Sequence, residues 1–186
     1  NESAALRRIN RFESVDIDCG KIGERCFFNI AGIGFDASVS DRFASETFRG
    51  PVGYLRTIIN VISKYKPKKY TLNIDGKVYE REAFMISVAN SPQYGNNAYI
   101  APNASINDGV LDVCIVHKFP LYTLPMMIFH LFNKTADQSE YVEIIPGKKI
   151  CIEQEGKAPL HLDGEPMDLG NKIDIEVQGN ALKIIC

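Results

Sequence analysis

The sequence lacks the features that mark several large protein classes. It has no tryptophan, and its 186 residues contain neither a Cys-x-x-Cys pair nor a glycine- or proline-rich repeat. These absences exclude collagen-like and low-complexity architectures and argue against a structural zinc site. The cysteines number five, and most lie in or beside apolar runs, where free cysteine behaves as a small hydrophobe. We therefore expect a protein from a reducing, cytoplasmic compartment.

Charge of one sign is also missing. The 21 Lys and Arg nearly balance the 23 Asp and Glu, which leaves a net charge of -2 and no basic footprint for nucleic acid. The uncharged apolar stretch 119–133 is too short to span the ~30 Å hydrocarbon layer of a membrane. We expect a soluble protein that binds no nucleic acid and meets the inner face of a membrane only peripherally.

A lysine-rich segment, 64–69, is the one local excess of charge, with lysines at positions 64, 66, 68 and 69. Such a run is usually a solvated helix end, since lysine favours a helix C-terminus. Attraction to anionic phospholipid headgroups is the functional alternative, and each lysine near such a surface contributes ~1 kcal/mol. The sequence leaves both interpretations open.

Short apolar segments separated by Gly, Asp and Asn turns dominate the chain and predict antiparallel strands. Strands are predicted over 15–19, 26–31, 70–74, 77–80, 83–89, 110–116, 141–145, 149–153, 160–163, 173–177 and 182–185. Apolar residues at helical spacing predict helices over 3–9, 35–43, 52–62 and 120–133. The prediction is one mainly β (α+β) domain over 1–186, a two-layer antiparallel β-sandwich with a two-helix insert and one late apolar helix.

The segment His161-Leu162-Asp163-Gly164-Glu165 is the sharpest cluster of chemistry-bearing residues. On a strand, His161 and Asp163 would share one face, and Gly164 would then let Glu165 turn back toward Asp163. Two carboxylates and an imidazole suit metal binding or proton transfer from a substrate hydroxyl. The alternative is a solvent-facing strand end with a tight turn.

A second cluster is the segment from Ser105 to Asp112, which contains Asn-Asp-Gly at 107–109. An Asp at such a turn, here Asp108, can bind a hard cation together with nearby backbone carbonyls. Asp112 would lie on the polar face of the following strand. An Asx turn without a metal is the alternative.

Three further features favour structural roles. Gly32 and Gly34 precede a predicted helix, but a third glycine is missing, so close backbone packing is preferred over an anion site. His117 and His130 each stand alone among apolar residues and are expected to be hydrogen-bonded structural histidines.

The order of several motifs is more informative than any one of them. The motifs are Phe-Phe-Asn-Ile-Ala-Gly-Ile-Gly-Phe-Asp at 27–36, Gly-Tyr-Leu at 53–55, Ser-Val-Ala-Asn at 87–90, Ala-Pro at 101–102, Ile-Asn-Asp-Gly-Val-Leu-Asp at 106–112 and Leu-Asp-Gly-Glu-Pro at 162–166. This series resembles the C-terminal domain of the diacylglycerol kinase family of lipid kinases, in particular its soluble bacterial members, with sphingosine kinases as distant relatives. The resemblance extends from about Ser14 to the end of the sequence.

The resemblance implies roles for six residues. Asp163 would be the base that takes the proton from the lipid hydroxyl, and Glu165 would orient it or help organise Mg²⁺. A structural Mg²⁺ would be held by the Asp108 carboxylate and by the backbone carbonyls of Ser105 and Val110, while Asp112 would support the cleft.

The resemblance also implies a partner. The family's Gly-Gly-Asp-Gly-Thr nucleotide loop is absent from this sequence, so we expect a missing N-terminal α/β domain that binds most of the ATP and joins this one in cis. Asn96 and Asn97 depart from the glycines of many relatives.

The expected function is therefore the acceptor side of an ATP-dependent lipid kinase that phosphorylates diacylglycerol or a related lipid, with little activity in this chain alone. A metal-dependent hydrolase using His161, Asp163 and Glu165 is one alternative. A non-catalytic sandwich that binds a membrane or a partner is the other, and a homo-oligomer is left open.

Overall fold

The computed structural model describes residues 2–35, 62, 65–156 and 159–185. Its helical elements are α1 (Glu2–Arg11), η1 (Leu121–Thr123), α4 (Leu124–Phe132) and η2 (Ala136–Gln138). Its strands are β1 (Ser14–Ile22), β2 (Arg25–Phe27), β3 (Ile30–Gly34), β4 (Lys68–Ile74), β5 (Lys77–Ala89), β6 (Gln93–Gly95), β7 (Ala98–Tyr99), β8 (Leu111–His117), β9 (Val142–Gly147), β10 (Lys149–Gln154), β11 (Pro159–Leu162), β12 (Glu165–Asp168) and β13 (Lys172–Ile185).

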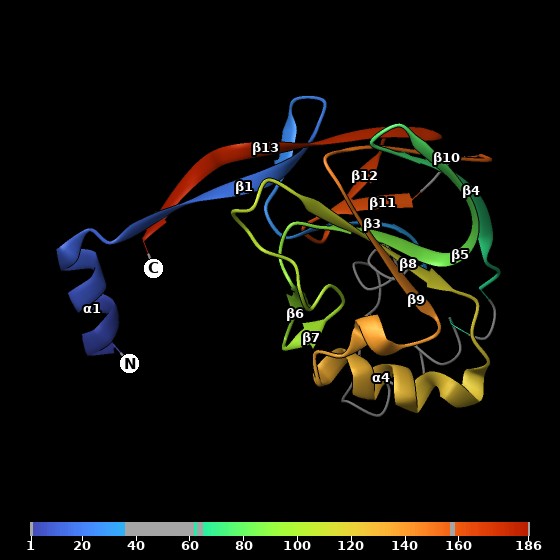
Figure 1. Cartoon of the computed structure of the whole chain (residues 1–186), viewed down its shortest axis with the longest axis horizontal. Coiled ribbons are helices and arrows are strands. Elements are labelled where there is room, and N and C mark those ends of the chain that lie inside the picture. The colour runs from blue at the N-terminus through green and yellow to red at the C-terminus, as the bar shows by residue number, and fades with distance from the viewer. Residues whose placement is uncertain (1, 36–61, 63–64, 157–158, 186) are drawn as a thin grey trace.

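The strands form one antiparallel sheet that curls into two layers, and β6 and β7 pair separately (Figure 1). The long strand β5 belongs to both layers, because its first half pairs with β4 and its second half with β3 and β8. One layer has the order β12-β11-β3-β5-β8-β9, and the other has β5-β4-β10-β13-β1-β2. The predicted mainly antiparallel β-sandwich is confirmed.

Side chains from both layers meet in the principal core. In β4 the alternate residues Tyr70, Leu72 and Ile74 are buried, and they pack with Ile150 and Ile152 of β10. Each fully buried apolar side chain of this size contributes roughly 1.5–3 kcal/mol to folding. The period of two in the sequence thus defines the inner face of this layer.

A second core lies on the other face of β5 and β8, where α4 covers the sheet and buries Met127. Aromatic rings fill this space: the ring centroids of Phe35 and Phe84 are 4.3 Å apart, and those of Tyr65 and Phe84 are 5.1 Å apart. The predicted late helix is confirmed, with Pro125 in its first turn rather than in its interior.

Of the other predicted helices, the one at the N-terminus is present in the structure and the two of the insert are not described. The expected N-terminal helix over 3–9 is confirmed and extends over Glu2–Arg11. The expected two-helix insert lies outside the described residues, apart from Phe35 and Ile62 at its ends. Within the described ranges, no helix is long and apolar enough to cross a membrane.

Several predicted boundaries are wrong. The segments 77–80 and 83–89 are one continuous strand, β5, and Lys68 and Lys69 begin β4 rather than ending a helix. The predicted turn at 179–180 is a bulge inside β13, where the register opposite β1 shifts between Ile17 and Cys19. Gly34 packs closely, as expected, because an added Cβ would lie 2.8 Å from the hydroxyl oxygen of Tyr70.

The strands β1 and β13 continue beyond the sandwich as a two-stranded arm, which carries α1 at its tip (Figure 1). Large apolar side chains on and beside α1 are exposed, namely Leu6, Ile9 and Phe12, the last with 79% of its surface accessible. A helix of this length is marginal unless an apolar face packs against another element. The arm therefore presents a surface suited to a further folded unit.

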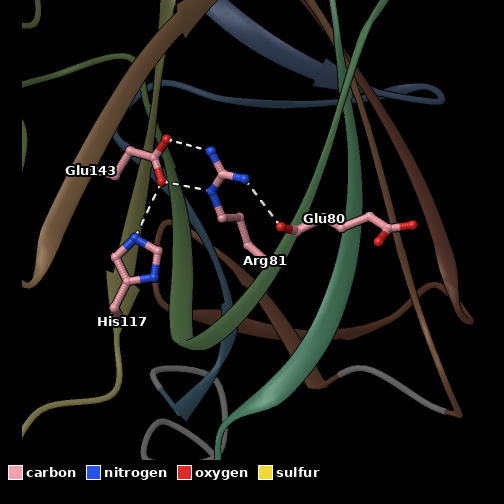
Figure 2. A network of polar contacts seen from close by, with 4 residues as sticks. All are labelled: Glu80, Arg81, His117 and Glu143. Atoms are coloured by element: carbon pink, nitrogen blue, oxygen red, sulfur yellow. Dashed lines mark hydrogen bonds and ion pairs between the residues drawn. The ribbon is translucent and has the colours of Figure 1, made fainter.

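A charged network connects three strands, β5, β8 and β9, of the layer that also contains β3 and β11 (Figure 2). Arg81 on β5 binds Glu143 on β9 through two bonds, Nε to Oε2 at 2.8 Å and Nη2 to Oε1 at 2.9 Å. His117 on β8 lies 3.2 Å from the same Oε2 through its Nε2. The hydrogen bonds from Arg81, followed in size by those from His117, hold the pKa of Glu143 below its ordinary value of 4.5, although partial burial opposes them.

We expect Glu143→Gln to lower the free energy of unfolding by about 1 kcal/mol at pH 7, a small effect because both Arg81 and Glu143 side chains are 31% exposed. A lowered pKa in the folded state stabilises the protein above the unfolded-state pKa, and this stabilisation disappears as the pH falls through the folded-state value. Urea unfolding should therefore separate the variant from the parent chain at pH 7, and the difference should shrink as the pH falls through the folded-state pKa of Glu143. The exposed Glu82 on β5 provides the control, and a loss in Glu143→Gln that persists unchanged at low pH contradicts the prediction.

Candidate functional site

Asp163 occupies a tight turn and not a strand. It joins β11 to β12 together with Gly164, and both residues have positive φ, 50° and 91°. A two-residue hairpin loop with this backbone is the one for which Asp-Gly is preferred. The prediction that Asp163 continues the strand and shares a face with His161 is wrong, because the left-handed backbone at Asp163 redirects its side chain.

Three consecutive backbone amides hold the Asp163 carboxylate. Phe28 N donates to Oδ2 at 2.8 Å, while Asn29 N and Ile30 N donate to Oδ1 at 2.9 and 2.8 Å. The amide of Asp163 in turn donates to the carbonyl of Ile30 at 2.9 Å. This arrangement explains why the predicted single strand over 26–31 is divided into β2 and β3, since these amides bind a carboxylate.

The same contacts leave Asp163 able to accept one more hydrogen bond. An ionised carboxylate offers about four lone-pair positions. Two are used at Oδ1 and one at Oδ2, so a position remains at Oδ2, and the residue is exposed. The structure thus presents an oriented carboxylate oxygen to solvent, which is the geometry that proton abstraction from a hydroxyl requires.

His161 and Glu165 do not converge with Asp163 as the sequence suggested. His161 is buried, and its Nδ1 accepts the amide of Gly164 at 3.2 Å. Glu165 begins β12 opposite Leu162 and is exposed. Among the described residues, no three His, Cys, Asp or Glu side chains are grouped as metal ligands. The geometry therefore gives no support to a hydrolase that uses these three residues.

The Asn-Asp-Gly loop is held by a residue that the sequence did not single out. Asp18 on β1 is buried, with 4% of its surface exposed. Its Oδ2 accepts the amide of Gly109 at 2.7 Å, its Oδ1 accepts the amide of Asn180 at 3.0 Å, and its own amide donates to Ile106 O at 2.7 Å. Asp18 thus fixes the loop and the β13 bulge together.

Inside the loop, Asp108 forms the Asx turn that the sequence left open as the alternative: its Oδ1 accepts the amide of Val110 at 3.1 Å. Burial raises the pKa of Asp112, and the negative charge of Asp108 raises it further. The loop thus brings the carboxylates of Asp108 and Asp112 close enough for their charges to interact, and carboxylate oxygens are ligands that Mg²⁺ prefers.

Asn90 connects the two clusters. Its side chain is fully buried, and Nδ2 donates to the carbonyls of Asp18 at 3.0 Å and Phe28 at 2.9 Å. Its amide donates to the carbonyl of Asn29 at 2.9 Å. A continuous hydrogen-bonded path therefore extends from the Asn-Asp-Gly loop through Asp18 and Asn90 to the amides that hold Asp163.

Known proteins resemble this chain in sequence and in fold. Residues 29–186 match the family described as the YegS C-terminal NAD kinase beta sandwich-like domain. A protein named "Probable lipid kinase YegS-like" from Shewanella frigidimarina is 25% identical over 175 residues, which cover 93% of this chain and 56% of that protein. A protein of the same name from Chromohalobacter salexigens is 28% identical over 153 residues, which cover 81% of this chain and 49% of that protein.

A solved diacylglycerol kinase structure from Bacillus anthracis str. Sterne superposes with a TM-score of 0.69 at 20% identity, covering 100% of this chain and 58% of that one. This likeness supports the fold. The chain spans about half the length of the curated relatives that it matches.

Asp18→Ala should reduce the free energy of unfolding by about 3 kcal/mol, because it removes two hydrogen bonds to a charged group, each contributing roughly 1.5–3 kcal/mol, and leaves the amides of Gly109 and Asn180 without this acceptor. Urea unfolding followed by far-ultraviolet circular dichroism measures the loss. Asp16→Ala on the same strand is the matched control, since Asp16 is exposed and its ion pair with Lys183 is 3.7 Å long. Equal losses in the two variants are inconsistent with an anchoring role for Asp18.

Proposed function

The chain belongs to the family of YegS C-terminal NAD kinase β-sandwich-like domains, and from this membership we propose that it is the acceptor-side domain of an ATP-dependent lipid kinase. The names of its relatives support a lipid as the substrate. The observation that carries the proposal is the exposed Asp163 carboxylate, fixed by three amides with one acceptor position remaining at Oδ2. The substrate would be diacylglycerol or a related lipid with a free hydroxyl.

In this proposal Asp163 is the general base. The lipid hydroxyl donates its proton to Oδ2, its oxygen bonds to the γ-phosphorus of ATP, and the bond from that phosphorus to the leaving ADP breaks. Phosphoryl transfer depends mainly on positioning and on charge stabilisation. The contacts from Phe28, Asn29 and Ile30 supply positioning, because they fix the orientation of the carboxylate before the lipid arrives. Glu165, exposed on the same hairpin, would orient the base or help organise Mg²⁺.

ATP would be bound mainly by a companion domain in cis. This chain matches 56% and 49% of the length of two relatives, and the exposed apolar residues Leu6, Ile9 and Phe12 on the arm offer a surface for such a domain. Asp163 would then face a cleft that the companion domain completes. The full activity belongs to the two domains together.

Mg²⁺ would be held by the Asp108 carboxylate and by the carbonyls of Ser105 and Val110, with Asp112 beside them. The ion would neutralise the repulsion between the two carboxylates, which contributes to the raised pKa of Asp112. Its role would be structural, because the loop is joined through Asp18 and Asn90 to the amides that hold Asp163.

Asp163→Asn, in the chain joined to its companion domain, should lower lipid phosphorylation by about a hundredfold or more, the range expected for loss of a general base. Transfer of labelled phosphate from ATP to diacylglycerol in mixed micelles measures the rate. Asp168→Asn is the control, because it makes the same change at an exposed position of the same hairpin.

Unfolding of Asp163→Asn separates a catalytic role of Asp163 from a structural one. The asparagine would keep an acceptor oxygen for the amides of Asn29 and Ile30, so a catalytic role predicts that cooperative unfolding persists while turnover is lost. A structural role alone predicts that both are impaired together. Near-normal turnover in this variant removes Asp163 from the mechanism.

Asp108→Asn should weaken Mg²⁺ binding by about tenfold or more, because it removes the one charged donor of the proposed set. Calorimetric titration of the chain with MgCl₂ measures the affinity without any need for activity. Asp137→Asn, an exposed acid outside the loop that accepts a hydrogen bond from Asn103, is the control. Heat of binding that is unchanged in Asp108→Asn places the ion elsewhere.

A further inference from the structure

The helix α4, together with η1, presents apolar side chains away from the sandwich. Met127 is its only buried residue. Large apolar side chains cover the outer side, with 57% of Phe129, 54% of Phe132 and 83% of Tyr122 exposed. The remaining members of this outer apolar face are Leu121, Met126 and Ile128. Contiguous exposed apolar surface of this kind marks an interaction site.

The sequence run that carries this outer apolar face is positively charged. The run 118–134 contains no Asp or Glu and has an exposed lysine at each end, Lys118 and Lys134. The ammonium of Lys134 lies 4.5 Å from the centre of the Tyr99 ring.

Two acids follow the helix in the sequence. Asp137 accepts a hydrogen bond from Asn103 at 3.1 Å. Glu140 lines a groove of about 430 Å³ together with Tyr122 and Met126 of the outer apolar face. An apolar helix face bordered by lysines is complementary to an anionic lipid surface, because its side chains enter the acyl boundary while the ammonium groups meet phosphates.

The outer apolar face is structurally connected to the candidate base. α4 contacts β7, and β7 pairs with β6 in the hairpin that lies beside it in Figure 1. The carbonyl of Tyr94 in β6 accepts a hydrogen bond from Asn29 Nδ2 at 3.4 Å, and the amide of Asn29 donates to Asp163. The β6–β7 hairpin and Asn29 therefore connect α4 to Asp163, the residue that would receive the proton of the lipid hydroxyl.

We propose that α4 and η1 form the surface by which this domain docks on an anionic lipid bilayer, lying in the interface with Tyr122, Phe129 and Phe132 inserted among the lipid chains. The proposal rests on the proposed function, since a lipid substrate must be reached at a membrane. Docking through this surface would present the Asp163 side of the domain to the substrate layer.

Vesicle flotation of the whole chain tests the proposal without ATP or catalysis. Vesicles of phosphatidylcholine alone are compared with vesicles of equal parts phosphatidylcholine and phosphatidylglycerol. The chain should bind the anionic vesicles about tenfold more than the neutral ones, and Phe129→Ser with Phe132→Ser should reduce that binding by about tenfold or more, since two buried aromatic contacts are lost. Lys118→Glu with Lys134→Glu should remove the preference for anionic vesicles.

Phe12→Ser is the matched control, because it makes the same change at an exposed phenylalanine of the arm. It should bind vesicles like the parent chain, as should Asp163→Asn, so failure of docking and failure of the catalytic proposal are distinguishable. The phenylalanine and lysine variants should retain the urea midpoint of the parent. Absence of vesicle binding in the parent chain, or equal binding by the Phe129/Phe132 variant, overturns the proposal. So does a change from dimer to monomer in that variant with vesicle binding intact, which would assign the face to a second copy.

Discussion

The capture of one carboxylate by three consecutive amides is the interaction on which the rest of the site depends. Asp163 lies in a two-residue turn, and its contacts with Phe28, Asn29 and Ile30 join two elements that are distant in the sequence. The bend between β2 and β3 exists because these amides bind Asp163. A residue held in this way is fixed in orientation, yet an oxygen position stays exposed, so anchoring and chemistry use different lone pairs of one group.

Asp18 and Asn90 extend this constraint across the sandwich. Burying a carboxylate is costly unless hydrogen bonds replace its hydration, and Asp18 receives them from the Asn-Asp-Gly loop and from the β13 bulge. Asn90 uses both side-chain N–H groups to connect Asp18 with Phe28. A change in the loop can therefore reach the Asp163 turn through named hydrogen bonds. The Ser-Val-Ala-Asn motif and the Asn-Asp-Gly motif, separate in the sequence, are parts of one polar network in the structure.

Much of the fold follows from local patterns, and the site does not. The alternation of Tyr70, Leu72 and Ile74 predicts the inner face of β4, and Asp-Gly predicts the turn before β5. The bulge in β13 depends on Asp18, which lies far away in the sequence. Simple alternation along β1 predicts that Asp18 faces outward, but it is buried in the structure. Asp163 was identified as a candidate, but its strand assignment was wrong. Its positive φ depends on the two-residue turn and on the hydrogen bonds from the amides of residues 28–30, neither of which the alternation reveals. Contacts between distant segments override local periodicity at such positions.

The exposed apolar surface is as informative as the buried polar network. Among the described residues, most of the large exposed apolar side chains gather on the β1–β13 arm with its helix and on the outer side of η1 and α4. An isolated apolar side chain at the surface is ordinary, whereas a cluster loses the stabilisation that burial would provide.

The two exposed apolar clusters, on the arm and on the outer side of η1 and α4, differ in their structural surroundings. The arm carries a helix that lacks a packing partner in the sandwich, which suits another folded domain, whereas α4 already rests on the sheet and has lysines at both ends of an acid-free run. In the proposed function, a rigid second domain and a fluid anionic layer would therefore cover different surfaces. The Asp163 turn is bonded to Ile30 of β3 and, through Asn29, to Tyr94 of β6, so it would lie between the two partners.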